Sequence, residues 1–170
     1  ERANPVLIRV LEDRSQEPMV RHEAAEALGA IGSKDNVIVL EKYKNDPVTE
    51  VAETCELALQ RIKWLQKSNS ENGINSQYHS IDPAPASKIT DIEKLKSILL
   101  NDNESLFDRY QAMFTLRNIQ TKEAVEALGS ALKVGSALFR HEIAFVLGQL
   151  QDESGVPFLK HSLEDEEENE

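Results

Sequence analysis

An internal repeat of 31 residues constrains the fold of this chain more than any other feature of its sequence. The same helical pattern occurs four times, and 31 residues separate Arg21 from Ala52 and Arg109 from Arg140. In each copy, small or apolar residues fall at i, i+3, i+4 and i+7, which is one face of an amphipathic helix. Two-helix units that repeat at about this length are typical of an α-solenoid. The sequence therefore predicts an all-α superhelix.

A second helical segment precedes each copy of the pattern, so each unit should be a pair of antiparallel helices. We expect no strands, and we expect helices over residues 5–11, 20–31, 37–43, 48–65, 92–100, 106–119, 124–132 and 138–150. The apolar faces of these helices should form the core. The residues expected to be buried there are Ala24, Leu28, Cys55, Leu59, Leu116, Val146 and Leu147.

Residues 67–88 interrupt the repeat and have the composition of a linker. This segment holds glycine, asparagine, serine and two prolines, and it lacks helical periodicity. It divides the chain into two repeats at 1–66 and a second region at 89–170. The second region contains two further repeats and the start of a third.

Charge and composition restrict the classes of partner. The net charge of -11 argues against nucleic acid, which requires a basic face. It is compatible with a basic partner, although solubility is the simpler explanation. No run of residues approaches the roughly 18 apolar positions of a membrane span. The single cysteine, Cys55, excludes an internal disulfide and fits a reducing compartment.

Two of the four repeats open with the tripeptide Arg-His-Glu, at Arg21-His22-Glu23 and at Arg140-His141-Glu142. An imidazole beside a carboxylate suits a metal of intermediate hardness. One such pair could be a surface pair near a helix start, where the helix dipole favours Glu. The other two repeats carry Glu53-Thr54 and Tyr110-Gln111 at the same positions, so packing does not require His-Glu. The pattern therefore favours a metal site.

Other motifs for catalysis are absent from the sequence. A zinc-protease motif would need a second histidine at position 26 or 145, and these positions hold Glu26 and Phe145. The remaining histidines, His79 in the linker and His161 in the last helical segment, are interpreted as surface residues.

The two halves are also related to each other, because the segment around Pro157 resembles the segment around Pro5. By this relation, a counterpart of His22 would lie four positions after Glu170, and a counterpart of His141 would lie eleven positions before Glu1. The intact protein is thus expected to hold four His-Glu motifs, two in each half. Two metal ions that share a substrate oxygen lie roughly 3.5–4 Å apart, so we expect the linker to let the halves face one another.

Repeated His-Glu motifs in HEAT-type repeats, joined by a linker with Tyr78 and Asp82-Pro83-Ala84-Pro85, resemble the deoxyhypusine hydroxylase family. The segments EPMVRHEAAEALGAIG and GSALFRHEIAFVLGQLQ carry the likeness, which covers essentially the whole chain. The resemblance implies a HEAT-like α-solenoid and a non-haem centre of two Fe²⁺ ions that uses O₂. The implied substrate is the deoxyhypusine side chain of translation initiation factor 5A, and the implied location is cytoplasmic.

The resemblance assigns roles to residues at the matching positions. This chain matches the second and third of the family's four motifs, so His22, Glu23 and His141 are implied iron ligands. Glu142 is implied to face the amine of deoxyhypusine, with iron ligation as its alternative role. Because the first and fourth motifs are absent, we expect these 170 residues alone to bind iron weakly and to show no hydroxylase turnover.

Two other interpretations remain open on the residues alone. One is a non-catalytic HEAT-repeat scaffold that binds a partner peptide, and the other is a protein similar to the bilin-lyase-like HEAT proteins. Neither gives the two His-Glu motifs a purpose. The residues themselves are as compatible with manganese or zinc as with iron, and iron follows only from the resemblance.

Overall fold

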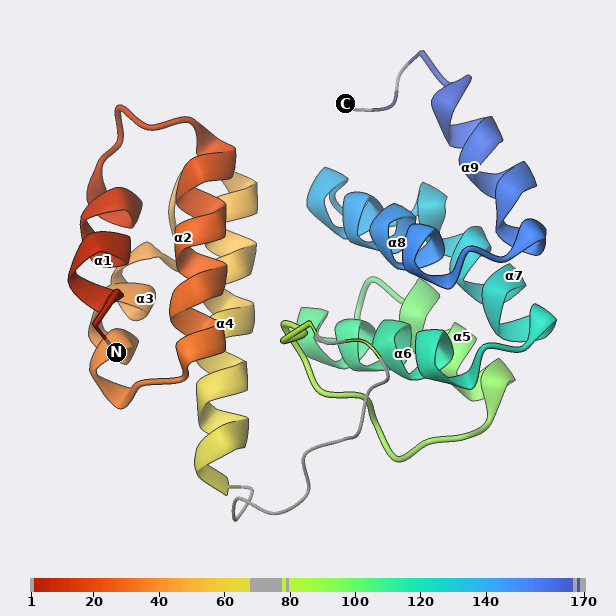
Figure 1. Ribbon diagram of the computed structural model, residues 1–170, viewed down its shortest axis with the longest axis horizontal. Coiled ribbons are helices and arrows are strands. Elements are labelled where there is room, and N and C mark those ends of the chain that lie inside the picture. Colours follow the sequence, from red (N-terminus) through yellow and green to blue (C-terminus); the bar gives the residue numbers. More distant parts are fainter. Residues whose placement is uncertain (1, 68–77, 79, 167, 169–170) are drawn as a thin grey trace. The chain divides into compact units, whose positions relative to one another are not determined.

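The computed structural model of the chain describes residues 2–67, 78, 80–166 and 168, and within them there is no strand. The helices form antiparallel pairs joined by short turns, as the ribbon of each unit shows (Figure 1). This confirms the predicted all-α solenoid. The chain divides into two compact units, Glu1–Ala84 and Pro85–Glu170. None of the helices described is both long and apolar enough to cross a bilayer.

Unit 1 contains two helix pairs. Helix α2 packs against α1 and along α4, and α3 packs against α4. Proline begins two of these helices: Pro5 is the second residue of α1 and Pro18 is the first residue of α2, where a missing N–H costs no hydrogen bond. The elements of unit 1 are α1 (Asn4–Glu12), α2 (Pro18–Ile31), the 3₁₀ turn η1 (Lys34–Asn36), α3 (Val37–Tyr43) and α4 (Thr49–Lys67).

Unit 2 continues the same architecture with clearer capping. The side chains of Asp91, Ser105, Thr121 and Ser136 each accept a backbone N–H from the first turn of the helix that follows. Such caps satisfy donors that a helix start leaves without partners. The elements are α5 (Ile92–Leu100), α6 (Leu106–Ile119), α7 (Lys122–Ser130), η2 (Ala131–Lys133), α8 (Ala137–Leu150), η3 (Glu153–Gly155) and α9 (Val156–Leu163).

The eight helices expected from the sequence are all present, with ends that differ by a few residues. The main difference lies near residue 130, where the expected helix over 124–132 begins at Lys122 and passes into the 3₁₀ turn η2. The seven residues expected to be buried are each no more than 3% exposed. The predicted helices and core positions are therefore confirmed.

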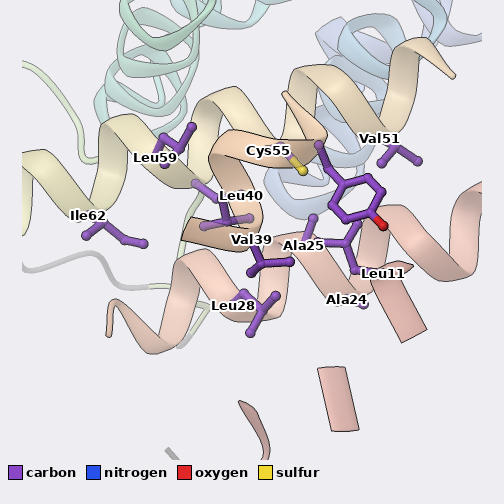
Figure 2. Packing of buried hydrophobic residues seen from close by; sticks show 12 residues of the cluster. Leu11, Ala24, Ala25, Leu28, Val39, Leu40, Val51, Cys55, Leu59 and Ile62 are labelled. Atoms are coloured by element: carbon purple, nitrogen blue, oxygen red, sulfur yellow. The ribbon is translucent and has the colours of Figure 1, made fainter. Parts of the chain in front are cut away.

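The core of unit 1 lies between its four helices. Figure 2 shows Leu28 of α2, Leu40 of α3 and Leu59 of α4 among the side chains gathered there. Full burial of each such side chain contributes about 1.5–3 kcal/mol. Gly29 allows α2 and α4 to approach closely, because a Cβ on it would lie 2.6 Å from the Cβ of Ala58. This close contact fixes how the two helices face each other.

The linker predicted at 67–88 falls only partly within the described residues, since 68–77 and 79 lie outside them. Helix α4 ends at Lys67, and no helix occurs from 80 to 91. The boundary between the two units follows Ala84, within the predicted segment. On the unit 2 side of this boundary, the backbone N–H of Ser87 donates to Thr115 Oγ1 at 2.7 Å. The limits of the linker stay a prediction.

Candidate metal centre

The two Arg-His-Glu tripeptides lie at the same position in their helices. His22 is the fifth residue of α2, and His141 is the fifth residue of α8. The carboxylates Glu23 and Glu142 are therefore the sixth residues, beyond the first turn where the helix dipole favours acidic side chains. A helix-start role does not account for either Glu.

The arginine of the first tripeptide has a structural role. Arg21 is 3% exposed, its Nε donates to the Leu11 carbonyl at 2.9 Å, and its guanidinium binds the Asp46 carboxylate at 2.6 Å. Arg109, at the same register of the third repeat, also donates its Nε to a carbonyl, that of Leu99, at 3.0 Å. In the first and third repeats, the arginine thus ties its helix to the helix before it.

The imidazole of His22 is buried, at 4% exposure, and is held by the neighbouring helix. Its Nδ1 lies 2.6 Å from Thr54 Oγ1, and the same hydroxyl donates to the Glu50 carbonyl at 2.7 Å. A carbonyl can only accept, and the hydroxyl has only one hydrogen. Both contacts are hydrogen bonds only if His22 Nδ1 carries a proton and donates it to Thr54. In the neutral ring, the lone pair is then on Nε2.

The carboxylate of Glu26 lies on the Nε2 side of His22. Glu26 Oε2 is 3.9 Å from Nε2, and the Glu26 side chain is 32% exposed. Burial, then the charge of Glu23, then that of Asp82 raise the pKa of Glu26 above its ordinary value. Glu23 itself is exposed. An imidazole lone pair that faces carboxylate oxygens is a mixed nitrogen and oxygen donor set, of the kind that divalent metals of intermediate hardness bind.

The second motif has different surroundings. His141 is exposed and Glu142 is half-buried, whereas Arg140 pairs with Glu168 at 2.6 Å. At the corresponding position of the third repeat, the ring of Tyr110 is 1% exposed. The two His-Glu motifs therefore share a helical position but differ in burial.

The two other histidines were predicted to be surface residues. His161 on α9 is exposed, and its Nε2 lies 2.6 Å from Lys133 Nζ. His79 falls outside the described residues.

Within the described ranges, no group of three or more His, Cys, Asp or Glu side chains gathers closely enough to hold a metal ion. The residues around His22 nonetheless fit one in kind, because the ring presents its Nε2 lone pair toward the carboxylate of Glu26 and Glu23 is the next residue in the chain. Two residues at this site were not selected from the sequence. Thr54 holds the position in the second repeat that Glu23 holds in the first, and Glu26 lies one helical turn after His22, where i and i+4 side chains meet.

Comparison with a family model identifies the repeats. The model described as HEAT repeats matches residues 1–60 and 92–170 of the chain. The unmatched stretch between them contains the predicted linker.

Several curated proteins are similar to the chain over nearly its whole length. It is 55% identical over 167 residues to the deoxyhypusine hydroxylase of Gallus gallus, an alignment that covers 98% of the chain and 56% of the relative. It is 55% identical over 166 residues to the protein of that name from Drosophila melanogaster, covering 97% of the chain and 55% of the relative. The human protein of that name is 52% identical over 162 residues, covering 95% and 53%.

Among solved structures, that of human deoxyhypusine hydroxylase in complex with glycerol matches the chain with a TM-score of 0.94 and 52% identity. This match covers 99% of the chain and 58% of the human structure. The chain thus spans about half the length of the curated relatives it matches.

Proposed function

Because this chain belongs to the HEAT-repeat family and is homologous to deoxyhypusine hydroxylases, we propose that it is part of a deoxyhypusine monooxygenase. The reaction would hydroxylate the deoxyhypusine side chain of translation initiation factor 5A with O₂, at a non-haem centre of two iron ions, to give hypusine. One observation carries the proposal beyond the similarity. The buried imidazole of His22 is held by Thr54 with its Nε2 lone pair toward the carboxylate of Glu26, in the form that binds a divalent metal.

We assign His22, Glu23 and His141 as iron ligands. Neutral imidazole nitrogens and ionised carboxylates are the protein ligands of non-haem Fe²⁺ sites, in which two histidines and one carboxylate commonly serve one ion. When bound, the iron would supply the activation of O₂ that insertion of oxygen into a carbon–hydrogen bond requires. His22 and Glu23 would supply ligands from unit 1, and His141 would supply a ligand from unit 2.

Glu142 is assigned to the substrate. Glu142 is half-buried in unit 2. The deoxyhypusine side chain carries aliphatic amines that are protonated at neutral pH, and a carboxylate binds an ammonium group through charge-assisted hydrogen bonds. The net charge of -11 also favours the approach of a basic side chain.

The proposed location is the cytoplasm. Cys55, the single cysteine of this sequence, is a free, buried thiol, which is compatible with a reducing compartment. Translation factors act in that compartment.

The test uses the full-length gene product that contains these residues, with single substitutions to alanine. His22→Ala, Glu23→Ala and His141→Ala should lower the iron content per chain, because each removes a ligand. Glu142→Ala should keep its iron but should reach half of its maximal rate only at a higher substrate concentration, because the substitution removes a partner of the substrate's ammonium group. Iron is measured by elemental analysis, and product is measured as the gain of one oxygen atom on deoxyhypusine by mass spectrometry.

The matched control is His161→Ala, since His161 is exposed on α9 and its Nε2 lies 2.6 Å from Lys133 Nζ. This variant should retain full iron and full activity. If His22→Ala and His141→Ala also retained both, the metal proposal would be wrong. A non-catalytic peptide-binding scaffold would then explain the fold better.

A further inference from the structure

We propose that Thr54 is a positioning residue that fixes His22 as the Nδ1–H tautomer, so that Nε2 is the atom that binds iron. This inference rests on the proposed function for the identity of the metal, but the tautomer itself is a property of unit 1. Thr54 lies on α4 and His22 on α2, 32 residues apart in the chain. Neither the sequence pattern nor the family comparison assigns Thr54 a role.

The hydrogen-bond geometry favours one tautomer. With Nδ1 protonated, the ring donates to Thr54 at 2.6 Å and the hydroxyl donates onward to the Glu50 carbonyl at 2.7 Å. With Nε2 protonated, the hydroxyl hydrogen would have to turn to Nδ1, and the contact with Glu50 would lose its hydrogen. Glu26 Oε2, at 3.9 Å from Nε2, is beyond hydrogen-bond distance.

The position of the hydroxyl is fixed by its surroundings. Thr54 is 3% exposed within α4, and a β-branched side chain in a helix has few χ1 rotamers. Its bond to the carbonyl four residues earlier selects one of them. One turn further along α4, Ala58 packs directly against Gly29 of α2. The hydroxyl is thus presented to the imidazole by a rigid helix–helix contact.

A metal-binding histidine usually donates a hydrogen bond from the N–H of its second ring nitrogen to a neighbouring acceptor, which orients the ring. Loss of that acceptor commonly costs 10–100-fold in metal affinity. Thr54 supplies this acceptor for His22. The repeat therefore uses one position in two ways, since the first repeat places the carboxylate of Glu23 there and the second places a hydroxyl that orients the adjacent histidine.

The first experiment determines the tautomer in the 170-residue chain without metal. Histidine is labelled with ¹⁵N, and long-range ¹⁵N–¹H correlations are recorded at pH 8, where an ordinary imidazole is neutral. The His22 signal is identified by its loss in His22→Gln. The chain itself and Thr54→Ser should show the Nδ1–H form of His22, whereas Thr54→Val, which keeps the shape but loses the hydroxyl, should not.

The control is Thr115→Val. Thr115 is a buried helical threonine of unit 2 that also donates to the carbonyl four residues earlier, that of Gln111, at 2.5 Å. Its loss should leave the His22 signal unchanged. If Thr54→Val failed to fold by circular dichroism, Thr54→Ala would take its place. A retained Nδ1–H form in the folded variant without the hydroxyl would overturn the inference.

The second experiment measures Fe²⁺ affinity in the full-length gene product by competition with a colorimetric chelator. Thr54→Val should bind iron 10–100-fold more weakly, whereas Thr54→Ser and Thr115→Val should bind it within about threefold of the unmodified protein. Unchanged affinity in Thr54→Val would overturn the positioning role. If His22→Ala also kept its iron, the proposed function would fail as well, while a tautomer shift in the metal-free chain would stand independently of it.

Discussion

Removing one partner of the buried ion pair between Arg21 and Asp46 should destabilise unit 1 more than removing one partner of an exposed pair. The two side chains are 4% and 0% exposed, and two guanidinium nitrogens contact the carboxylate, at 2.6 and 3.2 Å. Asp46 also accepts the backbone N–H of Val48 at 3.0 Å. Replacing Asp46 with alanine would leave a buried cation without its carboxylate.

The expected loss follows from burial. Removal of one partner from a buried ion pair commonly costs about 3–5 kcal/mol, because the remaining charge is desolvated and uncompensated. Arg21 would still donate to the Leu11 carbonyl and lie over the ring of Tyr43 at 5.6 Å, so we expect a loss near 3 kcal/mol, at the lower end of that range.

Unit 2 supplies a matched control. Arg109 has the register of Arg21 and is similarly buried, but its carboxylate partner Asp102 is 67% exposed, at 2.8 Å. Solvent screens such a pair, so Asp102→Ala should cost only about 0–1 kcal/mol.

The assay is urea denaturation of the chain at pH 7. Trp64, the single tryptophan of the chain, lies on α4 and reports the unfolding of unit 1, while circular dichroism follows the helices of both units. With a urea dependence of about 1–3 kcal/mol per molar, Asp46→Ala should lower the Trp64 midpoint by roughly 1–3 M. A loss no greater than that of Asp102→Ala, measured on the transition of its own unit, would refute the reasoning.

The pH dependence follows from the same pair, because the hydrogen bond from Arg21 lowers the pKa of Asp46. The stabilising contribution of the ionised Asp46 carboxylate is complete above its ordinary pKa of 3.8 and is lost as the pH falls further. The difference in urea midpoint between the unmodified chain and Asp46→Ala should therefore be constant from pH 8 to about 5 and should narrow below pH 3.8. Gly29→Ala should destabilise unit 1 by about 1–2 kcal/mol, because the new Cβ would lie 2.6 Å from Ala58 Cβ. Gly148→Ala, at the same register but with no atom within 4 Å of its new Cβ, should stabilise its helix by up to about 1 kcal/mol. The urea midpoints of the two variants test this, and equal effects would contradict the packing argument. Burial raises the pKa of the Cys55 thiol to about 12. The folded chain at pH 8 should therefore react with a disulfide reagent at least about 100-fold more slowly than the urea-unfolded chain. Comparable reaction rates would show that the thiol is accessible.

The fold and its core could be predicted from the sequence because they depend on local periodicity. Residues spaced at i, i+3, i+4 and i+7 share a helix face wherever they occur, and a repeated face can only be buried against its neighbours. For this reason Leu28, Cys55 and Val146 were placed in the core correctly. The same register argument selected His22 and His141 as the chemically distinctive positions.

Tertiary structure alone decided what surrounds His22. Helix α4 packs along α2 and buries the imidazole, although the position of His22 in its own helix is the same as that of His141. The contact between His22 and Thr54 joins residues 32 apart. It depends on how two helices cross, and that crossing is set by side-chain packing between them, which the periodicity of either helix does not specify.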